Sequence, residues 1–208
     1  KLIILRLSDT PIKNLDLIEK LTNLKKLILC NNEKLINLNG IEKLTKLIIL
    51  NLENCPNLQD FNFLSNLKNL KILNLRKCEK FSNSDLLKNL KKLINLDLRK
   101  TNIENLDGIS NLTNLKILRL EECKKLQNIS GLFNFTKFKT LNLGKCENLQ
   151  NIDGLSNLTN LTKLDLSYCK QLTNIDALSN LKNLENVVLF NCDNLKNVDS
   201  LFTLTNIT

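Results

Sequence analysis

One apolar pattern, LxxLxxLxLxxCxxLxxIxxLxN, recurs every 22 or 23 residues along nearly all of the 208-residue chain. Eight complete units begin at Leu21, Leu44, Leu67, Leu90, Leu112, Phe135, Leu158 and Leu181, with partial units before and after them. A unit this short cannot bury its apolar residues alone, whereas stacked units share one continuous core. The pattern therefore predicts a repeat solenoid.

The LxLxx segment of each unit alternates apolar and polar residues, which is typical of a short strand with one buried face. Each unit turns through about one full coil before the next strand begins, so we expect parallel strands about 4.8 Å apart. The residues between the leucines then form two exposed columns. The first holds Arg6, Ile28, Asn51, Asn74, Asp97, Arg119, Asn142, Asp165 and Val188; the second holds Ser8, Cys30, Glu53, Arg76, Arg99, Glu121, Gly144, Ser167 and Phe190.

Six of the seven cysteines occupy one position of the unit: Cys55, Cys78, Cys123, Cys146, Cys169 and Cys192. Neighbouring strands are spaced more widely than the typical separation of about 3.8 Å between the Cβ atoms of a disulfide. We therefore expect inert, buried free thiols, as a reducing compartment would maintain. Cys30 lies outside this ladder, and we expect it alone to react quickly.

The residues Leu112, Leu115, Leu118, Leu120 and Cys123 match the pattern LxxLxLxxN/C, and the other units repeat it. On these residues the chain resembles the leucine-rich repeat family over essentially its whole length. The resemblance implies an α/β repeat solenoid, a horseshoe with a parallel sheet on the concave face and short 3-10 or irregular segments on the convex face. Residues 1–208 are expected to form a single such domain.

Details of the unit are similar to two groups within that family. The segments 151–155 and 174–178 resemble the short repeats of bacterial internalins and of eukaryotic phosphatase regulators, and the residues that follow Cys169 resemble the repeats of plant immune receptors. The segment 81–87 departs from both groups. We expect a different backbone there, with a helical turn that begins at Ser84.

The chain opens at Lys1 without a methionine and has a partial unit at each end, so we expect it to be part of a longer protein. Solenoids normally end in repeats with a polar outer face. We therefore expect association through apolar end residues that have no outer neighbour: Leu2, Leu5, Leu7, Leu201, Leu204 and Ile207.

Composition argues against several classes of function. The chain has no histidine, no pairing of a nucleophile with a base and no glycine-rich phosphate loop, so we expect no catalytic residues, no cofactor and no metal site. The net charge is +9, but the lysines are dispersed along the whole chain, which argues against nucleic acid as the partner. No apolar run is long enough to span a membrane.

The four arginines all fall in the two exposed columns. Arg76, Arg99 and Arg119 lie on three successive units, with Lys77, Lys100, Asn74 and Asp97 beside them. Arginine forks bind carboxylates and phosphates, so this patch predicts a protein partner with an acidic or phosphorylated segment. The alternative is that the arginines pair with Glu53, Asp97, Glu121 and Glu122 and serve solubility.

A second candidate contact area contains Tyr168, Val188 and Phe190, where aromatic side chains are favoured in interfaces. The alternative is packing against the neighbouring unit. Taken together, these features predict a non-enzymatic protein-interaction module, either a cytoplasmic scaffold or regulatory domain, or a surface-exposed or secreted recognition domain. Six Asn-x-Ser/Thr sequons would accept glycans in the second case, at Asn111, Asn128, Asn134, Asn157, Asn160 and Asn206.

Overall fold

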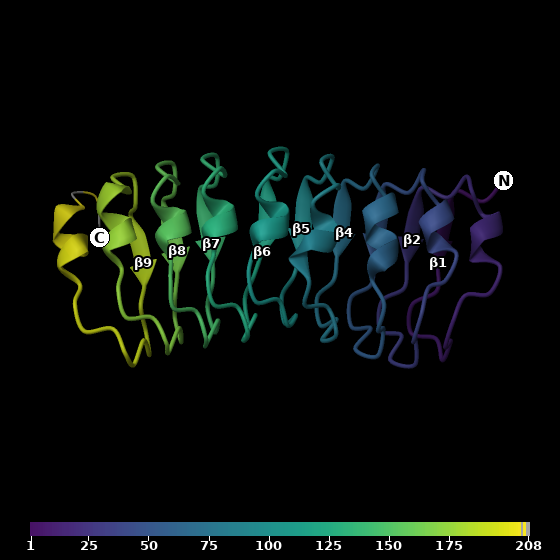
Figure 1. The fold of residues 1–208 in the computed structure, drawn as a ribbon, viewed down its shortest axis with the longest axis horizontal. Helices are drawn as coiled ribbons and strands as arrows, with labels where there is room; N and C mark the ends of the chain where they lie inside the picture. Colours follow the sequence, from purple (N-terminus) through teal and green to yellow (C-terminus); the bar gives the residue numbers. More distant parts are fainter. Residues whose placement is uncertain (205, 207–208) are drawn as a thin grey trace.

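The computed structural model describes residues 1–204 and 206. Within that part of the chain, nine short strands alternate with nine 3-10 turns, one of each per unit (Figure 1). The strands are β1 (Ile4–Arg6), β2 (Lys26–Ile28), β3 (Ile49–Asn51), β4 (Ile72–Asn74), β5 (Asn95–Asp97), β6 (Ile117–Arg119), β7 (Thr140–Asn142), β8 (Lys163–Asp165) and β9 (Asn186–Val188). The turns are η1 (Ile18–Lys20), η2 (Ile41–Lys43), η3 (Asn62–Asn66), η4 (Ser84–Leu87), η5 (Asp107–Ile109), η6 (Ser130–Leu132), η7 (Asp153–Leu155), η8 (Asp176–Asn180) and η9 (Asp199–Thr203).

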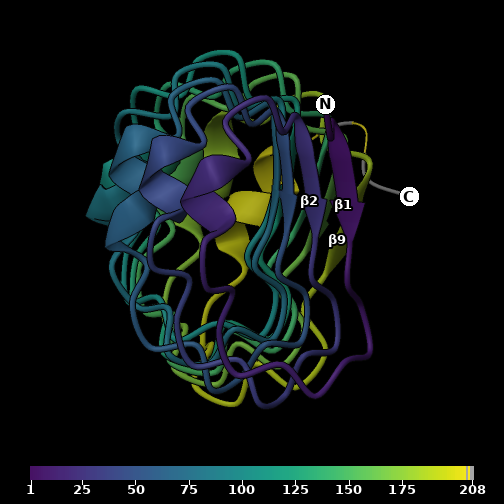
Figure 2. The same cartoon turned by 90° about the vertical axis from the view of Figure 1, so that its right-hand side faces the viewer.

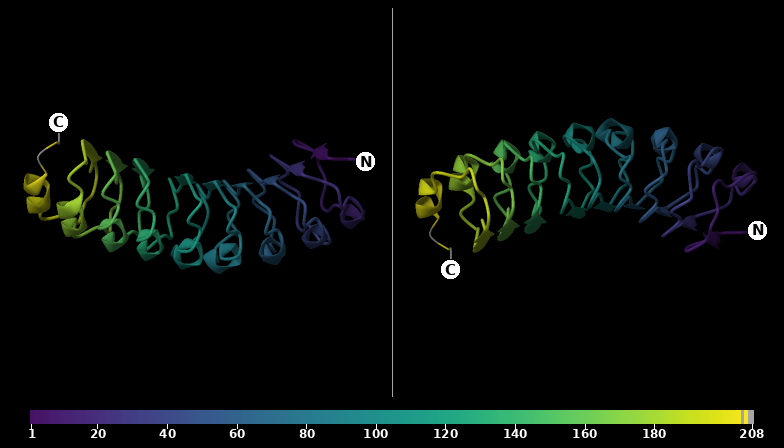
Figure 3. Two further views of the ribbon diagram at one scale, coloured as in Figure 1. Left: turned by 90° about the horizontal axis from the view of Figure 1, so that it is seen from above. Right: turned by 90° about the horizontal axis from the view of Figure 1, so that it is seen from below.

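Each unit forms one coil of a solenoid, with its strand on one side and its 3-10 turn on the opposite side (Figure 2). The stack bends into a shallow arc whose inner side carries the strands (Figure 3). All strand pairs are parallel, and the register places equivalent residues side by side, as in Leu27 with Leu50. The predicted fold class is confirmed, with the parallel strands on the concave face and short 3-10 turns on the convex face.

The parallel strands form two sheets instead of the single one expected. One sheet contains β1 to β6 in order, and the other contains β7, β8 and β9. The 3-10 turns nevertheless continue past this interruption without a gap in their order. The break therefore affects the concave face of a stack whose convex face is continuous.

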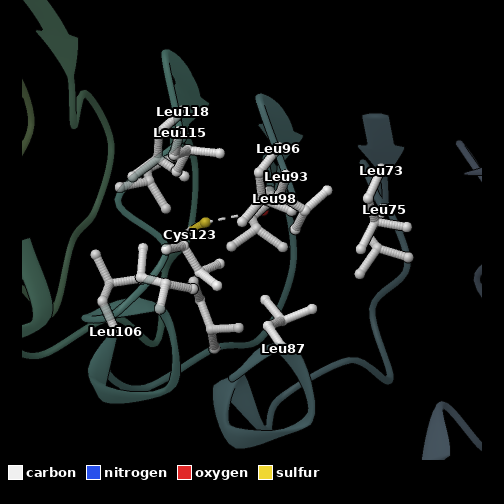
Figure 4. Close-up of a cluster of buried hydrophobic side chains, with 14 of the residues drawn as sticks. Leu73, Leu75, Leu87, Leu93, Leu96, Leu98, Leu106, Leu115, Leu118 and Cys123 are labelled. Atoms are coloured by element: carbon white, nitrogen blue, oxygen red, sulfur yellow. Dashed lines mark hydrogen bonds between the residues drawn. The ribbon is translucent and has the colours of Figure 1, made fainter. Parts of the chain in front are cut away.

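A continuous core of leucines fills the space between the two faces. The middle residue of each inner strand points into it, and Leu50, Leu73 and Leu96 are completely buried. Figure 4 shows the leucines of neighbouring units interleaving around Cys123. Burying one such side chain stabilises the fold by roughly 1.5–3 kcal/mol. Because each unit packs only on its neighbours, the stack holds together through many equivalent contacts.

Asparagine side chains start several of the 3-10 turns by accepting a hydrogen bond from the residue two positions later. The Asn83 side chain accepts from the backbone N–H of Asp85 at 2.9 Å, and Asn151 does the same for Asp153 at 2.7 Å. The predicted helical turn at Ser84 is confirmed as η4. The predicted difference in backbone lies at the residue before the turn: Asn83 is extended, with ψ 102°, whereas the equivalent residue before η5 has ψ 18°, although the other complete units also carry a 3-10 turn.

The cysteines of the ladder are free thiols in the structure, as predicted. Each donates to a strand-end carbonyl of the preceding unit, for example Cys55 Sγ to Leu29 O at 3.1 Å. Burial raises the pKa of Cys55 to about 11 and the pKa of Cys123 to about 12. Cys30 is not the single accessible thiol, since Cys192 in the last complete unit is also only partly buried.

The end residues differ in their exposure. Leu2 is 46% exposed, whereas Leu5, Leu7 and Leu201 are partly buried and Leu204 is only 7% exposed. Ile207 lies outside the described residues. Association through the ends stays a prediction.

Candidate binding surface on the concave face

Three columns of side chains line the concave face. Two are the predicted columns, and the strand register confirms that the members of the first lie side by side, as in Asn74 beside Asp97. The third column was missed by sequence reasoning. It consists of the first residue of each strand: Ile4, Lys26, Ile49, Ile72, Asn95, Ile117, Thr140, Lys163 and Asn186. The strand alternation already contained the signal, because each of these residues precedes a buried residue.

Asparagine and aspartate in the first column support the backbone at the end of their strand. Asn74 Oδ1 accepts from the backbone N–H of Arg76 at 3.0 Å, and Asp97 Oδ1 accepts from that of Arg99 at 3.1 Å. Asn51, Asn142 and Asp165 make the same bond in their units. Asn74 and Asp97, which were predicted as contact residues, therefore have a structural role in their own turns.

The second-column arginines pair with carboxylates of the same face. Arg76 Nη1 lies 2.8 Å from Glu53 Oε1, and Arg99 Nη2 lies 2.6 Å from Asp97 Oδ2. The Asp97 hydrogen bond raises the pKa of Arg99. Asp97 itself is 95% buried by its neighbours, being only 5% exposed. The alternative considered from the sequence, pairing with acidic residues, thus describes these two side chains.

The remaining members of the predicted arginine patch extend this network. Arg119 Nη1 donates to Asn95 Oδ1 at 3.0 Å, and Lys100 lies 3.1 Å from Glu122. Lys77 lies at the strand-end turn with a half-buried side chain. The patch therefore presents alternating positive and negative groups instead of a purely basic surface.

The predicted aromatic area is brought together by the fold. Tyr168 and Phe190 meet edge to face with ring centroids 5.4 Å apart, and Lys145 Nζ lies 6.0 Å from the Tyr168 ring centre. Phe190 remains 61% exposed and Val188 remains 38% exposed. These aromatic side chains therefore pack between neighbouring units and still leave apolar surface exposed.

Two hollows lie on the concave face. One of ≈ 260 Å³ spreads over β2 to β5 and includes Ile49 and Ile72 in its walls. The other, of ≈ 480 Å³, lies over β6 to β9 at the interruption of the sheet. Arg119 borders both hollows.

The interruption coincides with a pair of phenylalanines. Phe135 and Phe138 stack at 5.3 Å in the unit that contains β7, at two positions where the complete units otherwise have leucine. The larger rings need more space just before β7 begins. Leu118 of β6 is 8% exposed, whereas its counterparts Leu73 and Leu96 are fully buried. We attribute the separation of the strands to this bulk.

The described residues give no sign of metal chemistry or of a membrane span. No group of three or more His, Cys, Asp or Glu among them is placed to hold a metal ion. No helix in residues 1–204 has the length and apolar character needed to cross a bilayer.

Stacked parallel strands, convex 3-10 turns and a ladder of cysteines define the leucine-rich repeat class of solenoids. The chain belongs to the leucine-rich repeat family: a BspA-type leucine-rich repeat model matches residues 7–119, and a Zer-1-like leucine-rich repeat model matches residues 152–208. No curated protein sequence matches it. Domains of this family are typically non-enzymatic protein-interaction modules, and the family indicates protein interaction as the general class of function for this chain.

Solved structures show the same fold. Internalin C2 from Listeria monocytogenes shares 28% identity, with 86% of this chain and 76% of that chain covered and a TM-score of 0.66. The functional domain of InlJ from the same species, which includes a cysteine ladder, shares 20% identity over 98% of this chain and 47% of that one, with a TM-score of 0.69. The ectodomain of the Arabidopsis thaliana receptor kinase GASSHO1/SCHENGEN3 shares 20% identity over 99% and 29%, with a TM-score of 0.57.

Proposed function

We propose that the concave face binds an extended segment of a protein partner. The observation that supports this proposal is the exposure of isoleucines beside the charged network, with Ile72 37% and Ile117 42% exposed. Apolar contacts surrounded by polar and arginine side chains are the usual composition of an interface. Arg76, Arg99 and Arg119 would then meet the partner together with Lys77 and Lys100, and Tyr168 and Phe190 would extend the contact towards β9.

The charged network also bears on the chemistry of the partner. Arg76 and Arg99 already hold Glu53 and Asp97, so an acidic or phosphorylated segment would have to compete with these carboxylates. A segment with charges of both signs would complement the surface without breaking them. We therefore favour a partner of mixed charge over a purely acidic one.

The setting that we propose is intracellular, as a scaffold or regulatory domain. Seven free thiols suit a reducing compartment. In addition, the Asn160 side-chain nitrogen, which a glycan would occupy, donates to Thr136 O at 2.8 Å and joins two units. The secreted alternative is favoured by the resemblance to internalins and to a receptor ectodomain. Mass spectrometry of the protein from its native source, with thiols alkylated before lysis, distinguishes the two settings: seven free thiols and no glycans would support the intracellular one, and disulfides or glycosylated sequons would support the alternative.

The proposed function is tested with peptides selected from a phage-displayed library of random twelve-residue sequences. We expect Ile72→Ala and Arg99→Ala each to weaken the binding of a selected peptide at least about tenfold. Because Arg99→Ala leaves the Asp97 charge without its partner, the double variant Asp97→Asn/Arg99→Ala controls for lost stability. Lys43→Ala in η2 on the convex face is the control for charge alone. Isothermal titration at two salt concentrations measures each affinity.

Equal affinity of the concave variants and the wild-type protein would contradict the proposed function. A steep loss of affinity with salt, together with enrichment of acidic peptides, would instead restore the acidic partner predicted from the sequence. Enrichment of peptides with both charges would support the mixed partner.

A further inference from the structure

We propose that the break between β6 and β7 is an anchor pocket that accepts one aliphatic side chain of an extended peptide. This inference rests on the proposed function and narrows it to a particular subsite. A hollow of ≈ 480 Å³ extends over β6 to β9, and the anchor pocket is the end of this hollow that lies over β6 and β7. Its walls, its backbone and its charges each favour such a peptide.

The backbone at the break offers free hydrogen-bonding groups. Elsewhere in the stack the residue after a strand donates to the next unit, as Leu98 N does to Arg119 O at 2.9 Å. Within the described chain, the equivalent N–H of Leu120 has no such backbone acceptor. The bond between the same two units two residues later, from Glu122 N to Gly144 O, is retained at 2.9 Å. The main chain of a peptide that lies over the break supplies an acceptor for the Leu120 N–H group.

The same difference occurs at the start of β7. In the next unit, the N–H groups of Thr162 and Lys163 both donate to Lys139 O, at 2.8 and 3.1 Å. The corresponding N–H groups of Lys139 and Thr140 have no counterpart bond to Lys116 O among the described residues. The pocket is therefore flanked by unused main-chain groups from both sheets.

The walls explain why the occupant should be aliphatic. Ile117 of β6 is 42% exposed beside the break, and Leu118, the next residue of β6, is 8% exposed although its counterparts Leu73 and Leu96 are fully buried. Covering such side chains with an aliphatic group removes apolar surface from water, which gives roughly 25 cal/mol per Å². A polar side chain would leave these surfaces without a matching partner.

Charges at the two ends of the pocket orient the peptide. Lys116 and Lys163 lie at the amino-terminal edge of the strands, whereas two carboxylates, Glu121 and Asp165, lie with Arg119 at the carboxyl-terminal edge and leave it with a net negative charge. An acidic residue on one side of the anchor and a basic residue on the other would complement them. The geometry thus points to a peptide that runs along the strands, with an acidic residue over their amino-terminal edge, an aliphatic residue at the break and a basic residue over their carboxyl-terminal edge.

Phenylalanine to leucine exchange provides the decisive variant. Phe135→Leu/Phe138→Leu gives this unit the leucines of its neighbours, so we expect the strands to close and peptide affinity to fall at least tenfold. Phe61→Leu/Phe81→Leu is the matched control, since this pair also makes a ring contact, at 5.2 Å, away from the break. If the first double variant fails to fold, Ile117→Lys blocks the pocket from an exposed position and is expected to cause the same loss.

Hydrogen exchange of the backbone amides at the break tests the pocket directly, with the peptide selected from the displayed library as the probe. In the free protein, the amides of Leu120 and Thr140 should exchange faster than those of Leu98 and Lys163, and the peptide should slow them. Equal exchange in the free protein, or unchanged affinity in both pocket variants, would overturn the anchor pocket alone. Failure to enrich any peptide would overturn the proposed function and the pocket with it.

Discussion

A row of residues with left-handed backbone follows the strands, one position before the ladder. Its members have positive φ angles: Asp9, Asn31, Asn54, Lys77, Lys100, Glu122, Lys145, Tyr168 and Asn191. Their N–H groups continue the bonding between units, as Lys77 N does to Arg99 O at 2.9 Å. This backbone disfavours most side chains, but asparagine and aspartate tolerate it. The turn therefore imposes strain wherever lysine, glutamate or tyrosine occupies it.

Replacing Lys77 with asparagine should relieve that strain. We expect Lys77→Asn to raise the free energy of unfolding by about 0.5–1 kcal/mol, because asparagine adopts a positive φ more readily than lysine does. Urea denaturation measures the change. Lys91→Asn, at an exposed position outside this row, is the control and should give no gain. An equal effect of both substitutions would contradict the explanation.

The buried thiols make stability depend on alkaline pH. Burial raises the pKa of Cys123 and Cys169 to about 12, whereas thiols ionise near 9.0 without such burial. Above pH 9 the unfolded chain releases these protons and the folded chain keeps them, so the stabilisation from a protonated thiol is lost as the pH rises. Each buried thiol should lower the free energy of unfolding by about 1.4 kcal/mol per pH unit there.

Denaturation at pH 8, 9 and 10 tests this dependence. The double variant Cys123→Thr/Cys146→Thr should lose stability less steeply with pH, because threonine does not titrate. Threonine already occupies the ladder at Thr101, where it donates to Leu98 O at 2.7 Å. The same slope in the variant and the wild-type protein would show that other groups control the alkaline limit.

Single residues were predictable from the sequence where periodicity alone determines their place. The leucines and the free cysteines belong to this group, because one register fixes the burial of equivalent positions in the inner units, although Cys192 in the last complete unit is only partly buried. For Arg76 and Arg99 the sequence named Glu53 and Asp97 among four candidate carboxylates but did not decide between pairing and partner binding, since long side chains can reach several groups. The supporting role of Asn74 and Asp97 depends on a turn geometry that the apolar pattern does not describe.

At the scale of the elements, glycines allow successive 3-10 turns to approach closely. A Cβ atom on Gly131 of η6 would collide with the backbone carbonyl of Leu106, and Gly108 and Gly154 are equally confined in η5 and η7. The equivalent position in η8 holds Ala177, which is partly buried. The spacing of the turns therefore varies along the convex face.

Gly131→Ala should destabilise the protein more than a simple change of helix preference would. We expect a loss of about 2–3 kcal/mol, because backbone atoms must move to admit the methyl group. Thermal or urea denaturation gives the value. Ala177→Gly is the reciprocal control and should cost less than about 1 kcal/mol. If Gly131→Ala lowered the free energy of unfolding less than Ala177→Gly does, the close approach of the 3-10 turns would be refuted.

The 3-10 turns were partly predictable. In most units an asparagine stands two residues before the first residue of the turn. The break between β6 and β7 was not foreseen. Phe135 and Phe138 preserve the apolar pattern, so periodicity treats them as equivalent to leucine. Periodicity ignores their volume, to which we attribute the separation of the strands.

At the scale of the whole molecule, the break divides the backbone bonding into two blocks. Repeat proteins derive their cooperativity from contacts between neighbouring units, so weaker contacts at one junction favour separate opening. We expect the amides of β7 to β9 to exchange with a lower opening free energy than those of β3 to β5. Native-state hydrogen exchange at increasing denaturant measures both values. In the Phe135→Leu/Phe138→Leu variant, the two opening free energies should become more similar.

One opening free energy for both blocks of the wild-type protein would contradict this division. Neither the length nor the composition of the chain indicated this division, because both blocks have the same leucine pattern and the same strand register. It follows from the missing strand pairing and from the convex turns that continue past it.

The break also affects how such a protein can change its length by gaining or losing units. A unit added within β1 to β6 must match a fully bonded strand on both sides, and any misfit is transmitted to both neighbours. A unit added beside β7 meets at least one edge whose main-chain groups are already unpaired. Duplication of whole repeats is therefore tolerated most readily at this junction, and the concave surface can lengthen there while both existing blocks keep their internal register.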